Sequence, residues 1–175
     1  MDAAKLIETH GTDLALTLWP EWAWAITHLG KDVENRGRDL LASDRRLRAT
    51  GGRLWIHAGK TVGGGELSYT DAWGAVIDTA EHAGWRCDRR TMVFYQGDQA
   101  VSAPIKPRRH LLPRAALVAA AQIRLILGPR SGPVAWKVDG QYGHVLRVML
   151  VLTPPISCKG AQGLWSVSKQ LWSAA

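Results

Sequence analysis

The sequence predicts an α+β fold built around a small β-barrel with flanking helices. Its 175 residues, of which 46% are hydrophobic, are enough for one domain with a substantial core. Most segments with strand-like character are short, and only a few stretches have the apolar spacing of a helix. Short strands mixed with a few helices are typical of a small barrel.

The N-terminal part of the chain is predicted to hold a strand and then a helix. Residues 13–19 alternate as expected for a strand, and Pro20 suits the first turn of a helix that continues over 21–28. Gly30 is a natural stop for that helix. Residues 31–36 are short and polar, and either a strand or a loop fits them.

The middle of the chain is predicted to contain three further elements. An Arg-rich stretch over 40–50, which we expect to be exposed, precedes a strand over 53–57. Apolar spacing predicts a helix over 70–83, with Thr70 as its N-cap. A strand over 91–95 follows.

Two apolar strands are predicted in the last third of the chain. Residues 117–127 are rich in Val, Ile and Leu and indicate a buried strand. Residues 144–152 alternate well enough for another strand, which we expect Pro154 and Pro155 to end. Residues 160–165 are expected to form a tight closing segment.

Positive charge is concentrated in two segments. Lys and Arg total 22 against 15 Asp and Glu, which gives a net charge of +7. Residues 31–60 carry +4 and residues 106–175 carry +9, whereas 1–30 and 61–105 carry −3 each. If the two basic segments fold together, they make one positive face of the kind that binds nucleic acid. The alternative is a charge spread over the whole surface.

The composition argues against several classes of protein. Two cysteines, Cys87 and Cys158, without a CxxC pair do not support a disulfide scaffold or a zinc module. The histidines show no metal-ligand spacing, so we expect no metal ion and no other cofactor. The start lacks an apolar leader, and the apolar stretch 115–127 is too short to span a membrane. We therefore expect a cytoplasmic protein with no membrane partner.

Nine of the aromatic residues are Trp, and two of them bear on function. Trp22 and Trp24 lie two residues apart, so on a helix their rings face different directions. One is expected in the core, and the other can line a groove, where an indole stacks on a base.

The cluster of ionisable residues with the most varied chemistry consists of Lys31, Glu34 and Arg36. An amine, a carboxylate and a guanidinium this close in sequence can hold a polar ligand, polarise a carbonyl or relay a proton. From spacing alone, a surface ion-pair patch is the simpler interpretation.

Blocks of sequence between residues 14 and 166 occur in a distinctive order: LTLWPEWAWAI (16–26), GKDVENR (30–36), GRLWIHAGK (52–60), LPRAALVAAAQIR (112–124), GQYGHVL (140–146) and PISCKGAQGLW (155–165). In this order they resemble the ASCH domain family, named for activating signal cointegrator homology.

The chain departs from the family pattern in three places. Pro20-Glu21-Trp22 stands where the family usually has Gln-Pro-Trp, and Ala115 replaces the glycine of its "RGAI" block. Residues 62–111 are longer and more divergent than the family pattern, so we expect an insertion with its own helix.

The resemblance implies that residues 12–168 form one domain with a PUA-like β-barrel. Residues 1–11 are then an N-terminal extension, and residues 169–175 are a C-terminal tail. The insertion over 62–111 is a surface on which a protein partner can bind.

The resemblance also implies a cleft beside the first helix that takes RNA or a nucleobase. In the family picture, Lys31, Glu34 and Arg36 line that cleft. The residues expected to bind the nucleobase are Trp22, Trp24, Lys31, Glu34, Arg36, His57 and Lys60. Those expected to contact phosphates are Arg38, Arg53, Arg108 and Arg109.

Three hypotheses about function follow from these observations. The first is a module that binds RNA, another single-stranded nucleic acid or a nucleoside. The second is a hydrolase of the ribonuclease or N4-acetylcytidine amidohydrolase type, with Lys31 and Glu34 as catalytic residues. The amidohydrolase branch has a Thr, taken as its nucleophile, where this chain has Glu34, so that nucleophile is missing. The third is a regulator that acts through protein partners.

Overall fold

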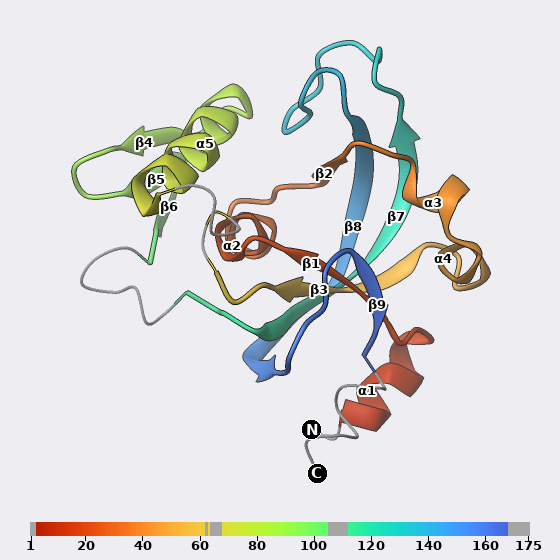
Figure 1. Ribbon diagram of the computed structural model, residues 1–175. Coiled ribbons are helices and arrows are strands. Elements are labelled where there is room, and N and C mark those ends of the chain that lie inside the picture. The colour runs from red at the N-terminus through yellow and green to blue at the C-terminus, as the bar shows by residue number, and fades with distance from the viewer. Residues whose placement is uncertain (1–2, 62, 64–67, 105–111, 168–175) are drawn as a thin grey trace.

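The computed structural model describes residues 3–61, 63, 68–104 and 112–167, which form a mixed α+β structure (Figure 1). The main sheet curls into a half-barrel. Its strands in spatial order are β2 (Val33–Arg36), β8 (Tyr142–Ser157), β7 (Ala116–Leu127), β3 (Arg53–Ala58), β1 (Leu14–Leu18) and β9 (Leu164–Ser166). A second, three-stranded sheet has the order β4 (Arg86–Asp88), β5 (Val93–Gln96) and β6 (Gln99–Ser102).

The pairing of β1 determines how the half-barrel is assembled. β1 pairs in parallel with β3 on one side and antiparallel with β9 on the other. In this register Thr17 lies opposite His57. The two side chains therefore stand next to each other near the ends of their strands.

In the described part of the chain, the helices that accompany the sheets are α1 (Ala3–His10), α2 (Pro20–His28), α3 (Leu40–Ser43), α4 (Arg45–Ala49) and α5 (Tyr69–His82). The predicted strand over 13–19 and helix over 21–28 are confirmed as β1 and α2. Helix α2 lies between the curled sheet and α5 (Figure 1). No helix in the described part of the chain is long and apolar enough to cross a membrane.

Helix α2 takes part in two apolar clusters. Ala23 and Ile26 belong to the cluster inside the main sheet. Trp24 belongs to the cluster formed with α5 and the second sheet, where its ring centroid lies 5.2 Å from that of Trp73 and 5.9 Å from that of Phe94. The expected helix within 62–111 is therefore confirmed as α5, and it is packed into the core rather than appended to it.

Several predicted details are wrong. Ser68, not Thr70, caps α5, because its hydroxyl accepts a hydrogen bond from the Asp71 amide. Strands β4 and β6 were not predicted. The Arg-rich stretch over 40–50 is largely exposed, as predicted, but it also forms α3 and α4, which bury Leu40 and Leu47.

Pro154 and Pro155 do not end the last long strand, since β8 continues to Ser157. The register with β7 jumps from Val151 opposite Ala119 to Ile156 opposite Leu117, so the two prolines fall in an irregularity. A proline lacks the amide proton that a ladder needs, and at this position it interrupts no regular pairing.

Candidate functional site

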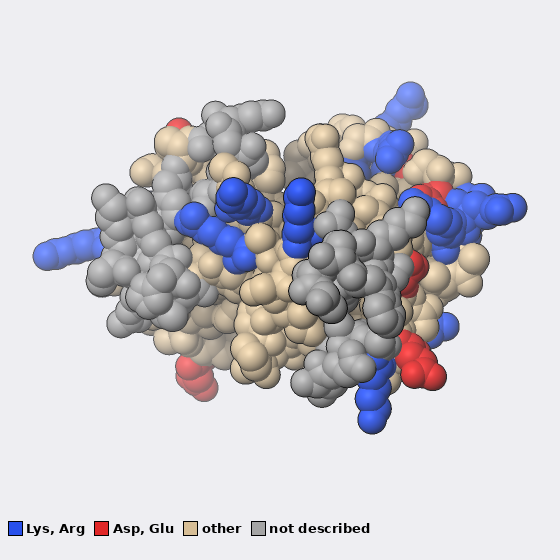
Figure 2. Space-filling view, turned by 60° about the horizontal axis from the view of Figure 1, so that its bottom comes forward, with Lys and Arg blue, Asp and Glu red and all other residues tan. Residues whose placement is uncertain are grey.

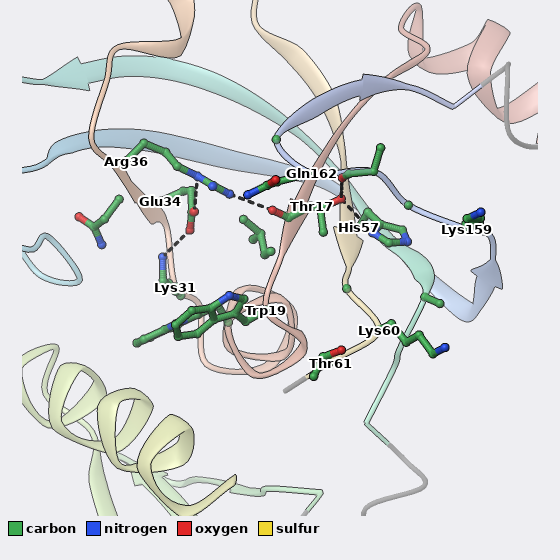
Figure 3. A pocket seen from close by; sticks show the side chains of 18 of the residues that line it. Thr17, Trp19, Lys31, Glu34, Arg36, His57, Lys60, Thr61, Lys159 and Gln162 are labelled. Atoms are coloured by element: carbon green, nitrogen blue, oxygen red, sulfur yellow. Dashed lines mark hydrogen bonds and ion pairs between the residues drawn. The ribbon is translucent and has the colours of Figure 1, made fainter. Parts of the chain in front are cut away.

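A cavity of about 800 Å³ lies where the ends of β1 and β3 meet the start of α2 and strand β2. The loop between β8 and β9 and the segment before β8 complete its wall. Figure 3 shows Lys31, Glu34 and Arg36 at one end of this cavity, and Lys60 and Lys159 at the other. The predicted cluster and two lysines from separate loops therefore line one space.

Lys31, Glu34 and Arg36 form a connected network beside the cavity. The Lys31 Nζ lies 3.3 Å from Glu34 Oε2, and the Arg36 Nε lies 3.0 Å from Glu34 Oε1. Lys31 also donates to the Val33 carbonyl, and Arg36 Nη2 donates to the Thr17 carbonyl at 2.9 Å. One carboxylate thus bridges two cations, and Arg36 ties β2 to β1.

The interpretation of this cluster as a surface ion-pair patch is wrong. Lys31 is 2% exposed and Glu34 is 7% exposed, whereas the Arg36 side chain remains 28% exposed. Burial lowers the pKa of Lys31, and the neighbouring Glu34 carboxylate partly offsets that effect. Charged groups are rarely buried unless they are paired, so the three side chains form a defined, mutually paired part of the cavity wall.

Two indoles form the wall next to this network. Trp22 and Trp19 are half-buried and line the cavity, and the Lys31 Nζ lies 5.5 Å from the centroid of the Trp22 ring. Trp24 is 3% exposed and lies in the core, stacked on His28. Of the predicted pair, only Trp22 lines the cavity. Trp19, which the sequence analysis did not single out, lines the cavity from the N-cap position of α2, directly before Pro20.

The Thr17 hydroxyl is the centre of a second network. His57 Nδ1 lies 3.1 Å from Thr17 Oγ1, and Trp165 Nε1 donates to the same oxygen at 2.9 Å. The hydroxyl donates to the Ala161 carbonyl at 2.6 Å. His57 Nε2 lies 3.2 Å from the Cys158 carbonyl, and burial lowers the pKa of this imidazole. These contacts hold the loop between β8 and β9 against β1 and β3.

Two residues that the sequence analysis did not single out, Asn35 and His144, fix the end of the cavity at which Glu34 lies. Asn35 donates to the Trp136 carbonyl at 2.8 Å and accepts from the Val138 amide at 2.9 Å, which fixes the segment before β8. His144 lies 3.1 Å from the Glu34 carbonyl through Nδ1 and accepts from the Leu40 amide at 3.0 Å through Nε2. Asn35 stands inside the recognised GKDVENR block, but its type alone gave no indication of this role.

Apart from Trp24, which lies in the core, the predicted site residues fall into three groups. Those that line the cavity are Trp22, Lys31, Glu34, Arg36, His57 and Lys60. Arg38 and Arg53 are exposed and do not line it, and the Arg53 Nε donates to the Thr50 carbonyl at 3.0 Å at the opposite end of β3 from Lys60. Arg108 and Arg109 lie outside the described residues. Lys159 and Gln162 also line the cavity and were not predicted.

Two further observations bear on the kind of ligand. Figure 2 shows Lys and Arg side chains near the middle of one face, where no acidic side chain stands among them, and further Lys and Arg side chains at its edges. Among the described residues, no group of three or more His, Cys, Asp or Glu side chains could hold a metal ion. A scan against models of protein families and a search of characterised proteins found no match to this chain.

Proposed function

We propose that this protein binds RNA or another single-stranded nucleic acid and takes an unstacked base into the cavity beside α2. The observation that carries the proposal is the buried Lys31–Glu34–Arg36 network next to two indoles in a cavity of about 800 Å³. That volume lies within the range of small-ligand sites. Single-stranded bases are recognised by stacking on aromatic rings together with hydrogen bonds to their edges.

Each part of the wall has a role in this proposal. Trp19 and Trp22 supply the faces on which a base stacks. The partly exposed Arg36 guanidinium donates to a base carbonyl, and Glu34 accepts from an exocyclic amine. Because a paired base cannot enter such a cavity without leaving its helix, a single strand is the preferred partner.

The resemblance to the ASCH family points the same way. The blocks that carry it include Lys31, Glu34 and Arg36 as well as the Lys60 and Lys159 loops. We propose on this basis that the half-barrel sheet is a PUA-like barrel and that the cavity is its ligand cleft.

Fluorescence anisotropy with labelled single-stranded and double-stranded RNA of equal length tests the proposal. Trp19→Ala is expected to weaken single-strand binding about 5- to 100-fold, which corresponds to the loss of one base stack. Glu34→Gln is expected to weaken it at least as much as Trp19→Ala. Glu8→Gln, on the exposed side of α1, is the control and leaves binding unchanged. Thermal unfolding of each variant separates loss of binding from loss of fold. Equal affinity in wild type, Trp19→Ala and Glu34→Gln contradicts the proposal.

A hydrolase acting in the same cavity is the second candidate. The Lys31 amine favours it, because burial lowers its pKa and Glu34 lies within hydrogen-bonding distance. Incubation with N4-acetylcytidine or short RNA, with and without a divalent metal, tests this candidate. Turnover that disappears in Lys31→Ala or Glu34→Ala supports an enzyme, and a folded protein that binds RNA without turnover supports the binding function.

A further inference from the structure

We propose that Lys60 and Lys159 form a phosphate subsite, so that the cavity binds a nucleotide in preference to a nucleoside. This inference rests on the proposed function, because it places the base at the end of the cavity that holds Glu34 and Arg36. It assigns the opposite end of the same cavity to the phosphate attached to that nucleotide's sugar.

The charges that line the cavity are unbalanced. Among the described residues of its wall, Glu34 is the single carboxylate, and its two oxygens face Lys31 and Arg36. Lys60 and Lys159 are exposed and form no ion pair with a described residue. Their two positive charges are therefore available to an anionic group of the ligand.

The backbone holds the two lysine loops side by side. The Ala115 amide donates to the Gly59 carbonyl at 3.2 Å, and the Cys158 amide donates to the Ala115 carbonyl at 2.9 Å. Gly59 directly precedes Lys60, and Cys158 directly precedes Lys159. Ala115 thus links the two loops, although they are about a hundred residues apart in sequence. Both lysines are placed by fixed backbone and not by chance proximity of two surface side chains.

Glycines stand next to both lysines, at positions that leave no room for a side chain. A Cβ on Gly59 would lie 3.1 Å from the Leu18 carbonyl, and one on Gly160 would lie 2.1 Å from His57 Cε1. The main chain before Lys60 therefore packs closely against β1, and the main chain after Lys159 packs closely against His57, so both lysine loops are held in place at this end of the cavity.

The order of the side chains along the cavity suits a nucleotide. Figure 3 shows the lysines beyond His57, on the other side of Thr17 from Arg36. An ammonium group binds phosphate as a point charge and tolerates several orientations. The same chemistry accepts the monoester of a mononucleotide or the diester of a strand, and the experiment distinguishes these two sources.

Calorimetric titration of the full chain measures the subsite directly. The probes are the four common ribonucleosides, their 5′- and 3′-monophosphates, and trinucleotides without terminal phosphates. The variants are Lys60→Gln, Lys159→Gln and their combination, with Lys5→Gln on the exposed surface of α1 as the matched control. For at least one base, a phosphorylated probe is expected to bind about tenfold or more tightly than its nucleoside. Each single variant reduces that advantage, the double variant removes it, and Lys5→Gln retains it.

The pattern of results separates this inference from the proposed function. A gain for monophosphates identifies the monoester as the ligand group, and a gain for trinucleotides alone identifies the diester of a strand. Equal affinity for nucleosides and all phosphorylated probes overturns the subsite and leaves the base site standing. The subsite is also overturned if Lys60→Gln and Lys159→Gln behave like Lys5→Gln. Failure of every probe, the trinucleotides included, overturns the proposed function as well.

Discussion

His144 is held in one protonation state by its two hydrogen bonds. Because Nε2 accepts from the Leu40 amide, the ring proton resides on Nδ1 and is donated to the Glu34 carbonyl. A second ring proton would remove the acceptor that Leu40 uses. Burial lowers the pKa of His144, and the hydrogen bond to Glu34 and its nearby charge partly offset this effect.

We predict that the protein loses stability as the pH falls below about 6.5. A depressed folded-state pKa means that the unfolded chain takes up the proton first, so unfolding binds protons. The contribution of His144 is therefore complete above the ordinary histidine pKa of 6.5 and is lost as the pH falls towards its folded value. Burial lowers the pKa of His28 and His57 as well. Urea unfolding at several pH values between 5 and 8 measures the effect.

Comparison of variants isolates the contribution of His144 to this pH-dependent loss of stability. His144→Gln is expected to show a smaller loss of stability between pH 7 and pH 5.5 than wild type. His82→Gln, which changes an exposed histidine, is expected to keep the wild-type slope. Burial raises the pKa of Glu21, which acts in the opposite direction but equally in all variants. An unchanged slope in His144→Gln contradicts the prediction.

The buried ion pairs predict strong coupling between Lys31 and Glu34. Lys31→Met leaves Glu34 buried with only Arg36 to balance it, which is expected to cost about 3–5 kcal/mol of unfolding free energy. The double variant Lys31→Met/Glu34→Leu removes both buried charges and is expected to lose less than the sum of the single variants. A double-mutant cycle by urea unfolding checks this, and additive losses contradict it.

At the scale of elements, the loop between β8 and β9 depends on Gly160. A Cβ there would overlap the His57 ring, so Gly160→Ala must displace the loop or the imidazole. We expect a loss of about 1–3 kcal/mol in unfolding free energy, as for other overpacked sites, together with weaker RNA binding. Gly37→Ala is the control, since nothing lies within 4 Å of its added Cβ. Wild-type stability in Gly160→Ala, measured by urea unfolding, contradicts the prediction.

The segment over 62–111, which the family resemblance predicts to be an insertion, contributes to the core around α2. Trp73 of α5 and Phe94 of β5 pack against Trp24 of α2, the helix that also carries Trp22 into the cavity wall. Deleting residues 62–111 would expose that core and disturb α2. A protein partner on this part of the chain is therefore better sought with substitutions of exposed residues than with a deletion.

The elements show which features can be predicted from sequence. Strand β1 and helix α2 were predicted because alternation and an N-terminal proline are local properties of the chain. The cap of α5 was misplaced because Ser68 and Thr70 are both good caps, and only the backbone decides between them. The continuation of β8 through Pro154 depends on the register of β7, which no local pattern contains. Asn35 was missed because its partners, such as Trp136, are about a hundred residues away.

At the scale of the whole molecule, the charge distribution predicts salt-dependent binding. The logarithm of the affinity for single-stranded RNA is expected to fall linearly with the logarithm of the salt concentration, by about 0.7 per phosphate contact. Lys60→Gln and Lys159→Gln should each reduce that slope by about 0.7. Anisotropy titrations over a range of KCl concentrations measure it. A flat response would mean that the +7 net charge has no part in binding.

The neighbours of β1 determine the order in which the molecule can be completed. One edge of β1 can pair only after β3 has been synthesised. The other edge can pair only after β9 has been synthesised, almost 150 residues later. The hydrogen bonds of the Thr17 hydroxyl likewise form only after His57, Ala161 and Trp165 have been synthesised. Contacts between segments so distant in sequence form slowly, because a long loop must close before they are made. On the ribosome, the cavity therefore stays open on one side until the β9 segment has emerged, and a nascent chain that stops short of it has no complete cavity wall.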